Sequence, residues 1–184
     1  LYVIAVNIAE RLWILSQASS AIILPRLSQL SSNPKLRDEL TPLLARWILA
    51  STALVALMVA VGIPTFLPLV FGNRFQGSAI PLLYLLPGIV VGSVSRVLAN
   101  DIAARGRPEL NMTTSVVVVI VNIFGNTLLI PSFGLAGAAI ATTIAYSLNL
   151  ALKLWKHCQF TGIPPIHSLV IQPSDIARLK KILA

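Results

Sequence analysis

The residues that decide the fold are 110–152, LNMTTSVVVVIVNIFGNTLLIPSFGLAGAAIATTIAYSLNLAL, a run without any Asp, Glu, Lys or Arg. As one α-helix this run would measure about 65 Å, whereas the hydrocarbon core of a bilayer is about 30 Å thick. Two helices therefore fit the run better than one. The segment Pro131–Gly134 marks the break, because proline removes a backbone donor and glycine admits a turn. The sequence predicts an integral membrane protein, with a short uncharged turn between these two spans.

The composition of the whole chain also favours the membrane class. Charged residues make up 11% of the chain and hydrophobic residues 56%, and the mean hydropathy is +0.84, whereas soluble domains are about 25% charged. The net charge is +8, but the bases gather beside the apolar runs, as the positive-inside rule requires, so nucleic-acid binding is not predicted. With Cys158 as the single cysteine, no intramolecular disulfide forms, and we predict neither a metal site nor a cofactor.

The apolar runs predict an all-α, polytopic transmembrane bundle of about five spans. The expected helices cover residues 2–24, 43–71, 79–100, 111–130 and 135–157, which together form a transmembrane bundle at 1–157, and residues 158–184 form a cytoplasmic tail. The charged segment 31–41 is expected to be a surface loop. Pro64 and Pro68 predict a kink or an early end of the second helix.

The basic residues predict the orientation of the chain. With five spans, the 25–42 loop, the 101–110 loop and the tail share one side of the membrane. Twelve Lys and Arg lie on or near that side, and only Arg74 lies on the other. The positive-inside rule therefore puts the C-terminus in the cytoplasm. The end of the tail places Ile176, Leu179 and Leu183 on one face of a short basic amphipathic helix, which would rest on the membrane surface.

Three charged residues stand out within the predicted spans, because a charge inside a membrane costs about 2.5 kcal/mol or more near the centre. Glu10 and Arg11 are adjacent in the first span, so they point about 100° apart and each needs a separate partner or a watery cavity. For Arg11 the alternatives are an anion-binding cavity and a structural ion pair. For Glu10 they are a structural pair or hydrogen bond and proton coupling. Arg96 lies near the end of the third span, where it either snorkels to the surface or contacts a ligand.

Three asparagines add polar groups to the spans. Asn7 lies in the first span, and Asn122 and Asn126 are four residues apart in the fourth, hence on one helix face. Hydrogen bonding between helices is their expected role, and lining a polar path is the alternative.

Catalysis is not predicted. The chain has no glycine-rich phosphate loop, no histidine cluster and only six acids, of which Glu10 alone lies well inside a span. An intramembrane transferase would need carboxylates near its active site, so we expect no enzyme.

Several motifs resemble those of a known family. They are Ala9-Glu10-Arg11-Leu12-Trp13 continuing to Pro25-Arg26-Leu27-Ser28, Phe71-Gly72-x-x-Phe75, Leu86-Pro87-Gly88, and Asn122-x-x-x-Asn126 continuing through Pro131, Gly134 and Gly137 to Thr142. In order and spacing they resemble the polysaccharide flippases of the multidrug/oligosaccharidyl-lipid/polysaccharide exporter superfamily. The resemblance covers about residues 1–160, and Gln172-Pro173-Ser174-Asp175 resembles the start of the family's cytoplasmic tail.

The resemblance implies a transporter of two six-helix lobes around a central cavity, in a bacterial inner membrane. It would flip an oligosaccharide carried on polyprenyl diphosphate by alternating access. Five spans would make up part of one lobe, so the other lobe of the parent chain would be a partner. Cationic residues in the cavity would suit the diphosphate, which makes Arg11 and then Arg96 the expected substrate contacts.

Two rival interpretations stay open. An ion-coupled drug or metabolite exporter of the same superfamily would use acids inside the spans, of which Glu10 is the one candidate. A self-contained membrane scaffold or subunit would act by oligomerising.

Overall fold

The computed structural model describes residues 2–14, 17–18, 34–170 and 175, and the regular structure in these residues is entirely helical. The helices are α1 (Tyr2–Arg11), α3 (Pro34–Phe71), the short 3-10 helix η2 (Asn73–Ser78), α4 (Ala79–Ala104), α5 (Pro108–Thr161) and a second 3-10 helix, η3 (Pro165–Ser168). Within the described residues, three stretches are long and apolar enough to cross a membrane, namely Leu36–Ile63, Phe75–Ala104 and Pro108–Thr161. The predicted all-α polytopic bundle is confirmed.

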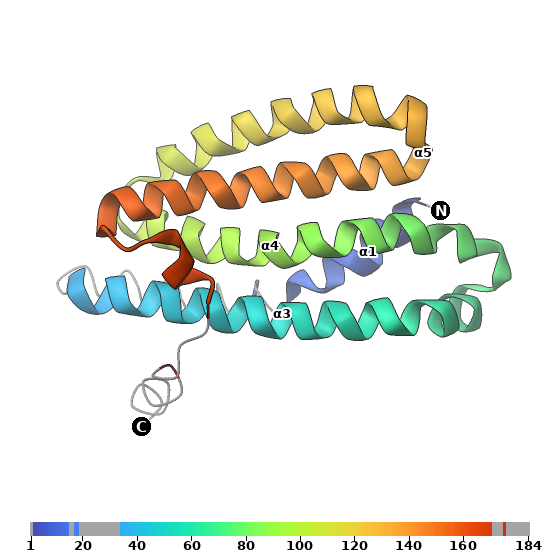
Figure 1. Ribbon diagram of the computed structural model, residues 1–184, viewed down its shortest axis with the longest axis horizontal. Coiled ribbons are helices and arrows are strands. Elements are labelled where there is room, and N and C mark those ends of the chain that lie inside the picture. The colour runs from blue at the N-terminus through green and yellow to red at the C-terminus, as the bar shows by residue number, and fades with distance from the viewer. Residues whose placement is uncertain (1, 15–16, 19–33, 171–174, 176–184) are drawn as a thin grey trace.

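Gly134 divides α5 into two antiparallel halves. Its φ of 55° and ψ of −131° lie in a region that favours glycine, and Figure 1 shows the outgoing half (108–133) lying beside the returning half (135–161). The hairpin is therefore the predicted pair of spans, although Gly134 alone makes the break and Pro131 lies within the helix. The halves approach so closely that a Cβ on Gly137 would overlap the backbone of Leu129.

The structure corrects the predicted loop at 31–41, because α3 begins at Pro34 and runs without interruption to Phe71. Proline is well tolerated in the first turn of a helix, where its missing N–H has no partner to lose. Pro34 therefore begins a helix instead of marking a loop. The predicted early end at Pro64 or Pro68 is also wrong, since the helix continues past both prolines.

The helix α4 lies at the centre of the bundle. Figure 1 shows it between α3 and the returning half of α5, with α1 crossing behind it. It runs four residues beyond its predicted end, to Ala104, and a tight turn at Gly106 (φ 75°) leads into α5. We call the end where α3 begins, α4 ends and α5 begins and ends the basic end. The opposite end, which holds η2 and Gly134, is the turn end.

Two predictions extend beyond the described residues. The first span, predicted at 2–24, is described only for residues 2–14 and 17–18, so this span and the total of five stay predictions. The amphipathic tail helix also lies outside the described residues, apart from Asp175.

Two apolar cores hold the helices together. One joins α1, α3 and α4 nearer the turn end, around Leu67, Leu82 and Ile89. The other joins α3, α4 and α5 nearer the basic end, around Val97 and Leu98. By contrast, the outgoing half of α5 exposes large apolar side chains, including Phe124 and Leu128. Such a face suits lipid tails, which solvate apolar side chains as a protein core would.

Candidate functional site

A cavity of about 200 Å³ lies between α1, α4 and the returning half of α5. Its walls are Tyr2, Val6, Ala9 and Glu10 from α1, Leu85 and Ile89 from α4, and Thr142 and Tyr146 from α5. A close approach of the two longer helices closes one side, because a Cβ on Gly88 would lie only 2.8 Å from the Cα of Thr143. We call this cavity, together with the adjoining Trp13, Arg96 and Lys153, the groove.

Trp13 and Arg96 stack next to this cavity. The Arg96 guanidinium lies over the Trp13 ring, with its central carbon 4.0 Å from the ring centroid. The Trp13 ring also packs on Tyr146 with centroids 5.3 Å apart, and its N–H donates to the carbonyl oxygen of Ile89 at 3.3 Å. The ring also lies against Gly92 of α4, where an added Cβ would be in ordinary van der Waals contact with it at 3.5 Å. Arg96 is thus held by an aromatic face, which attracts a cation by its quadrupole.

Glu10 and Arg11 line different cavities. Glu10 lines the groove, near enough to Arg96 and Tyr146 for their charges to interact. Arg11 lines a larger apolar cavity of about 490 Å³ between α1 and α3, whose walls include Val55, Ile63 and Leu67. The structure therefore brings Glu10 and Arg96 together and leaves Arg11 on another side of α1, so the two predicted cations lie in separate places.

Lys153 is a further cation near Arg96. It is one of the twelve bases on or near the predicted cytoplasmic side. It lies on the returning half of α5 with a relative exposure of 6%. Its positive charge is close enough to that of Arg96 for the two to repel. Within the described residues it makes no hydrogen bond and no ion pair.

The asparagines hold the α5 hairpin together. The side-chain amide of Asn126 donates to the Asn122 carbonyl oxygen at 2.9 Å, and the Asn122 amide reaches the hydroxyl of Thr142 on the returning half at 3.5 Å. This geometry fits the predicted hydrogen bonding between helices. Asn7 is exposed on α1.

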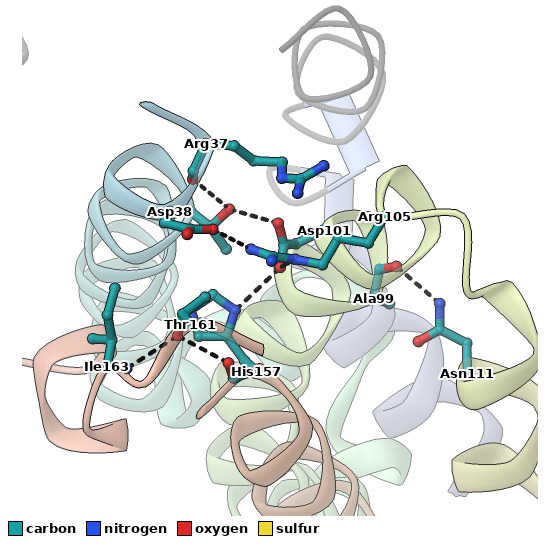
Figure 2. Close-up of polar contacts among 10 residues, drawn as sticks. Arg37, Asp38, Ala99, Asp101, Arg105, Asn111, His157, Thr161 and Ile163 are labelled. Carbon is teal, nitrogen blue, oxygen red and sulfur yellow. Dashed lines mark hydrogen bonds and ion pairs between the residues drawn. The ribbon is translucent and has the colours of Figure 1, made fainter. Parts of the chain in front are cut away.

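A second polar group lies at the basic end and joins α3, α4 and α5 through the buried carboxylate of Asp101 (Figure 2). Three side chains contact its two oxygens: the Thr41 hydroxyl at 3.1 Å, the Arg105 Nε at 2.8 Å and the His157 Nδ1 at 3.1 Å. Arg105 also pairs with Asp38 at 2.6 Å. We call these five residues the charge cluster.

The charge cluster satisfies its ions internally. Burial by itself would lower the pKa of Arg105, but the hydrogen bonds and negative charges of Asp101 and Asp38 outweigh it, so this pKa is raised above its ordinary value. The arginine therefore stays charged and bridges the start of α3 to the end of α4. Figure 2 also shows Asn111 donating to the Ala99 carbonyl oxygen, at 2.8 Å, which ties the start of α5 to α4.

The chain beyond α5 docks against α3 through Arg46. Arg46 and Asp175 form an ion pair of 2.9 Å, and both side chains are buried. The Arg46 guanidinium also donates to the carbonyl oxygen of His167 at 2.9 Å. The start of the tail is therefore fixed at the basic end, on the same side as the charge cluster.

Comparison with known proteins identifies the family. The profile described as lipid II flippase MurJ matches residues 11–171, which include α3, α4, α5 and η3. The chain belongs to the MurJ lipid II flippase family. A curated relative from Haloferax volcanii, named "Probable low-salt glycan biosynthesis flippase Agl15", is 30% identical over 152 residues. That match covers 80% of this chain and 32% of the relative, so the chain spans about a third of the relative's length. No solved structure matches the chain significantly.

Membership of the MurJ family confirms the resemblance to lipid-linked oligosaccharide flippases that the motifs indicated. The matched residues include both walls that α4 and α5 contribute to the groove, and also Arg11, Arg96 and Lys153. They include the charge cluster as well. The family match and the apolar helices together make this a multi-pass membrane protein.

Two features of this MurJ-family chain were not predicted from the sequence, for different reasons. Lys153 follows directly after the uncharged run 110–152, and its position seven residues after Tyr146 was a signal that it shares a helix face with the groove. The charge cluster left no comparable signal, because Asp38, Asp101 and His157 are far apart in the chain and only tertiary packing joins them.

Proposed function

We propose that this chain is part of a transporter, not an enzyme, that flips an oligosaccharide linked to polyprenyl diphosphate across a membrane by alternating access. The match to the lipid II flippase family over residues 11–171 supports the class of protein. The printed name of the curated relative, a glycan biosynthesis flippase, supports a glycan head group. The observation that carries the proposal is the groove, in which Arg96 and Glu10 lie beside a cavity between membrane-spanning helices.

Such a groove suits a substrate with one polar and one apolar end. A charged side chain inside a membrane marks a substrate or ion pathway more often than a structural feature. The polar head of the substrate would pass along the groove, while its polyprenyl tail stays among lipid tails. The groove supplies positive charge from Arg96, aromatic faces from Trp13 and Tyr146, and hydroxyls from Tyr2 and Thr142.

In this proposal the basic end faces the cytoplasm, and the turn end faces the opposite side of a bacterial inner membrane. The distribution of Lys and Arg supports this orientation. The second lobe of the parent transporter would close the groove from the open side of α1. Arg11, in its own cavity between α1 and α3, remains the predicted second contact of the substrate.

The test is complementation of a cell that lacks its own lipid-linked glycan flippase with the full-length parent protein. Export of glycan by the wild-type parent is the expected result, and its failure in a well-expressed parent would overturn the proposed function. Arg11→Ala should reduce export on the order of tenfold or more, because a charge-assisted contact to the substrate is lost. Arg11→Lys keeps the charge and is the matched control. Normal export by Arg11→Ala, at normal membrane insertion, would remove Arg11 from the substrate path.

A further inference from the structure

His157 places a buried imidazole against a buried carboxylate at the basic end. Its side chain is 1% exposed, and its Nδ1 lies 3.1 Å from Oδ2 of Asp101. The other ring nitrogen, Nε2, is buried and has no hydrogen-bond partner within the described residues. A neutral imidazole can donate its one proton from Nδ1, and a protonated imidazole keeps this hydrogen bond and adds a positive charge. The contact with Asp101 is therefore available to both protonation states of the ring.

The charge cluster holds more negative than positive charge when His157 is neutral. Asp38 and Asp101 both contact Arg105, at 2.6 and 2.8 Å. Within the described residues, no other arginine or lysine pairs with either acid. Two carboxylates therefore share one guanidinium. A nearby opposite charge favours the charged form of a titratable group, and a proton on His157 would bring the net charge of the cluster to zero.

Other charged or titratable side chains surround the charge cluster, and most of them are cations. The helices α3 and α5, the residue before α5, and η3 contribute Arg37, Lys153, Lys156, Arg107 and His167. These cations oppose a proton on His157. The carboxylate of Asp101 is nevertheless the one charged group in hydrogen-bond contact with the ring among the described residues. Since the interaction of two charges weakens with distance, this contact has the strongest influence on the ring.

The contact of His157 with Asp101 joins separate helices at the basic end (Figure 2). Asp101 ties the ring of α5 to α4, and it is tied in turn to α3 through the hydroxyl of Thr41. A change in the charge of His157 therefore alters the packing of one helix on another. Histidine is the side chain whose charge ordinarily changes between about pH 5 and pH 8, and protonation of a histidine can shift such an interface.

We propose that Asp101 and His157 form a proton-binding site that fastens α5 to α4 at the basic end. When the ring binds a proton, the hydrogen bond gains the attraction between an imidazolium and a carboxylate. When the proton leaves, the hydrogen bond remains but the cluster again carries an excess negative charge. The extra stability is thus present at low pH and is lost as the pH rises through the range in which histidine loses its proton. The proposal concerns helix packing and does not depend on the proposed function.

Thermal melting of the purified full-length parent protein, between about pH 6 and about pH 8, tests the site. His157→Asn is the test variant, because its amide can donate to Asp101 in place of Nδ1 but takes up no proton. The wild type should melt about 2 °C or more above this variant near the lower pH, and the difference should shrink as the pH rises. His167→Asn is the matched control, because it removes the other histidine of the chain, which is exposed, and it should follow the wild type at every pH.

A difference in melting temperature that stays constant with pH would overturn the proposal, because the ring would then keep one charge state throughout. A difference that grows as the pH rises would overturn it as well, because a proton would then loosen the packing. Asp101→Asn keeps the shape of the side chain and removes its charge, so it gives a second measurement if His157→Asn does not fold. This variant should lack the gain in melting temperature that the wild type shows at low pH, and an equal gain would contradict the proposal.

These measurements do not involve transport, so they separate the proton site from the proposed function. Failure of glycan export by the parent protein would overturn the proposed function and leave the proton site standing. Melting curves of wild type and His157→Asn that run parallel over this pH range would overturn the proton site and leave the proposed function standing.

Discussion

The groove and the charge cluster share two helices, α4 and α5, yet their charged residues are partnered in opposite ways. Asp101 is five residues beyond Arg96 on α4, and His157 is four beyond Lys153 on α5, so the two groups are only about 6–8 Å apart along the helices. In the charge cluster, Asp101 accepts from three side chains and Arg105 pairs with two acids. In the groove, Arg96 and Lys153 have no such pairing within the described residues.

This difference separates a structural role for charge from a functional one. A cluster whose carboxylates and arginine pair with one another binds helices together, although the buried Nε2 of His157 has no hydrogen-bond partner within the described residues. Cations without a paired acid contribute little to the stability of the fold, and they remain able to bind an anion. Removing a charge should therefore have opposite consequences in the two places.

The largest effect is expected for Asp101→Ala. It would leave Arg105 and His157 buried without their carboxylate, and breaking a buried pair costs about 3–5 kcal/mol. The melting temperature of the purified protein in detergent should fall sharply, and the yield with it. Glu109→Ala, which removes an exposed acid at the start of α5, is the control and should melt as the wild type does. An unchanged melting temperature for Asp101→Ala would mean that the charge cluster does not hold the helices together.

Gly88→Ala should have the next largest effect, because it tests whether packing shapes the groove independently of charge. The new methyl group would lie 2.8 Å from the Cα of Thr143, and such overpacking costs about 1–3 kcal/mol. In Gly62→Ala the methyl group meets nothing within 4 Å, so this control should be neutral or gain up to about 1 kcal/mol from helix propensity. The melting temperatures of the two variants are the measurement. Equal melting temperatures would show that the contact between α4 and α5 at Gly88 is not tight.

Trp13→Leu tests whether the contact between Trp13 and Arg96 serves stability, as the charge cluster does, or export, as proposed for the groove. It removes the face on which Arg96 lies, at a cost of about 0.5–2 kcal/mol. Trp13→Phe keeps a ring face and should lose less. Melting temperature and glycan export measured together separate the roles, since a groove residue should lower export more than stability. If Trp13→Leu and Trp13→Phe behave alike in both measurements, the cation–π contact is unimportant.

The smallest effect on stability is expected for Lys153→Met, and it gives the sharpest contrast with Asp101→Ala. Replacing the Lys153 side chain, which forms no hydrogen bond or ion pair within the described residues, by an apolar side chain of similar length should change the free energy of unfolding by no more than about 1 kcal/mol, or raise it. The melting temperature should stay equal or increase while glycan export falls. A large loss of stability in this variant would show that Lys153 has a structural partner.

Sequence patterns predicted those parts of the fold that depend on one stretch of chain. The uncharged run 110–152 and Gly134 were sufficient for the α5 hairpin, because a bilayer limits the length of each span and glycine permits the left-handed turn. The start of α3 was predicted wrongly for a related reason. A proline after a polar segment has the same local signature at the end of a loop and in the first turn of a helix, and Pro34 belongs to the helix.

The candidate site was predicted only in part. Glu10, Arg11 and Arg96 stood out because they are charges inside apolar runs. Their grouping could not be foreseen, since Glu10 of α1 lies near enough to Arg96 of α4 for their charges to interact, while Arg11, its neighbour in the chain, lies in another cavity. The pairing of Trp13 with Arg96 likewise joins residues that are far apart in the chain.

The sequence by itself therefore determined that this is an all-α membrane protein resembling lipid-linked glycan flippases. These properties follow from hydropathy and motif order, which are local. Only the tertiary structure decided that Asp101 contacts three side chains, and that Lys153 and Arg96 form no ion pair with a carboxylate among the described residues. The physical reason is that the energy of a buried charge depends on its neighbours in space, and these come from helices far apart in the chain.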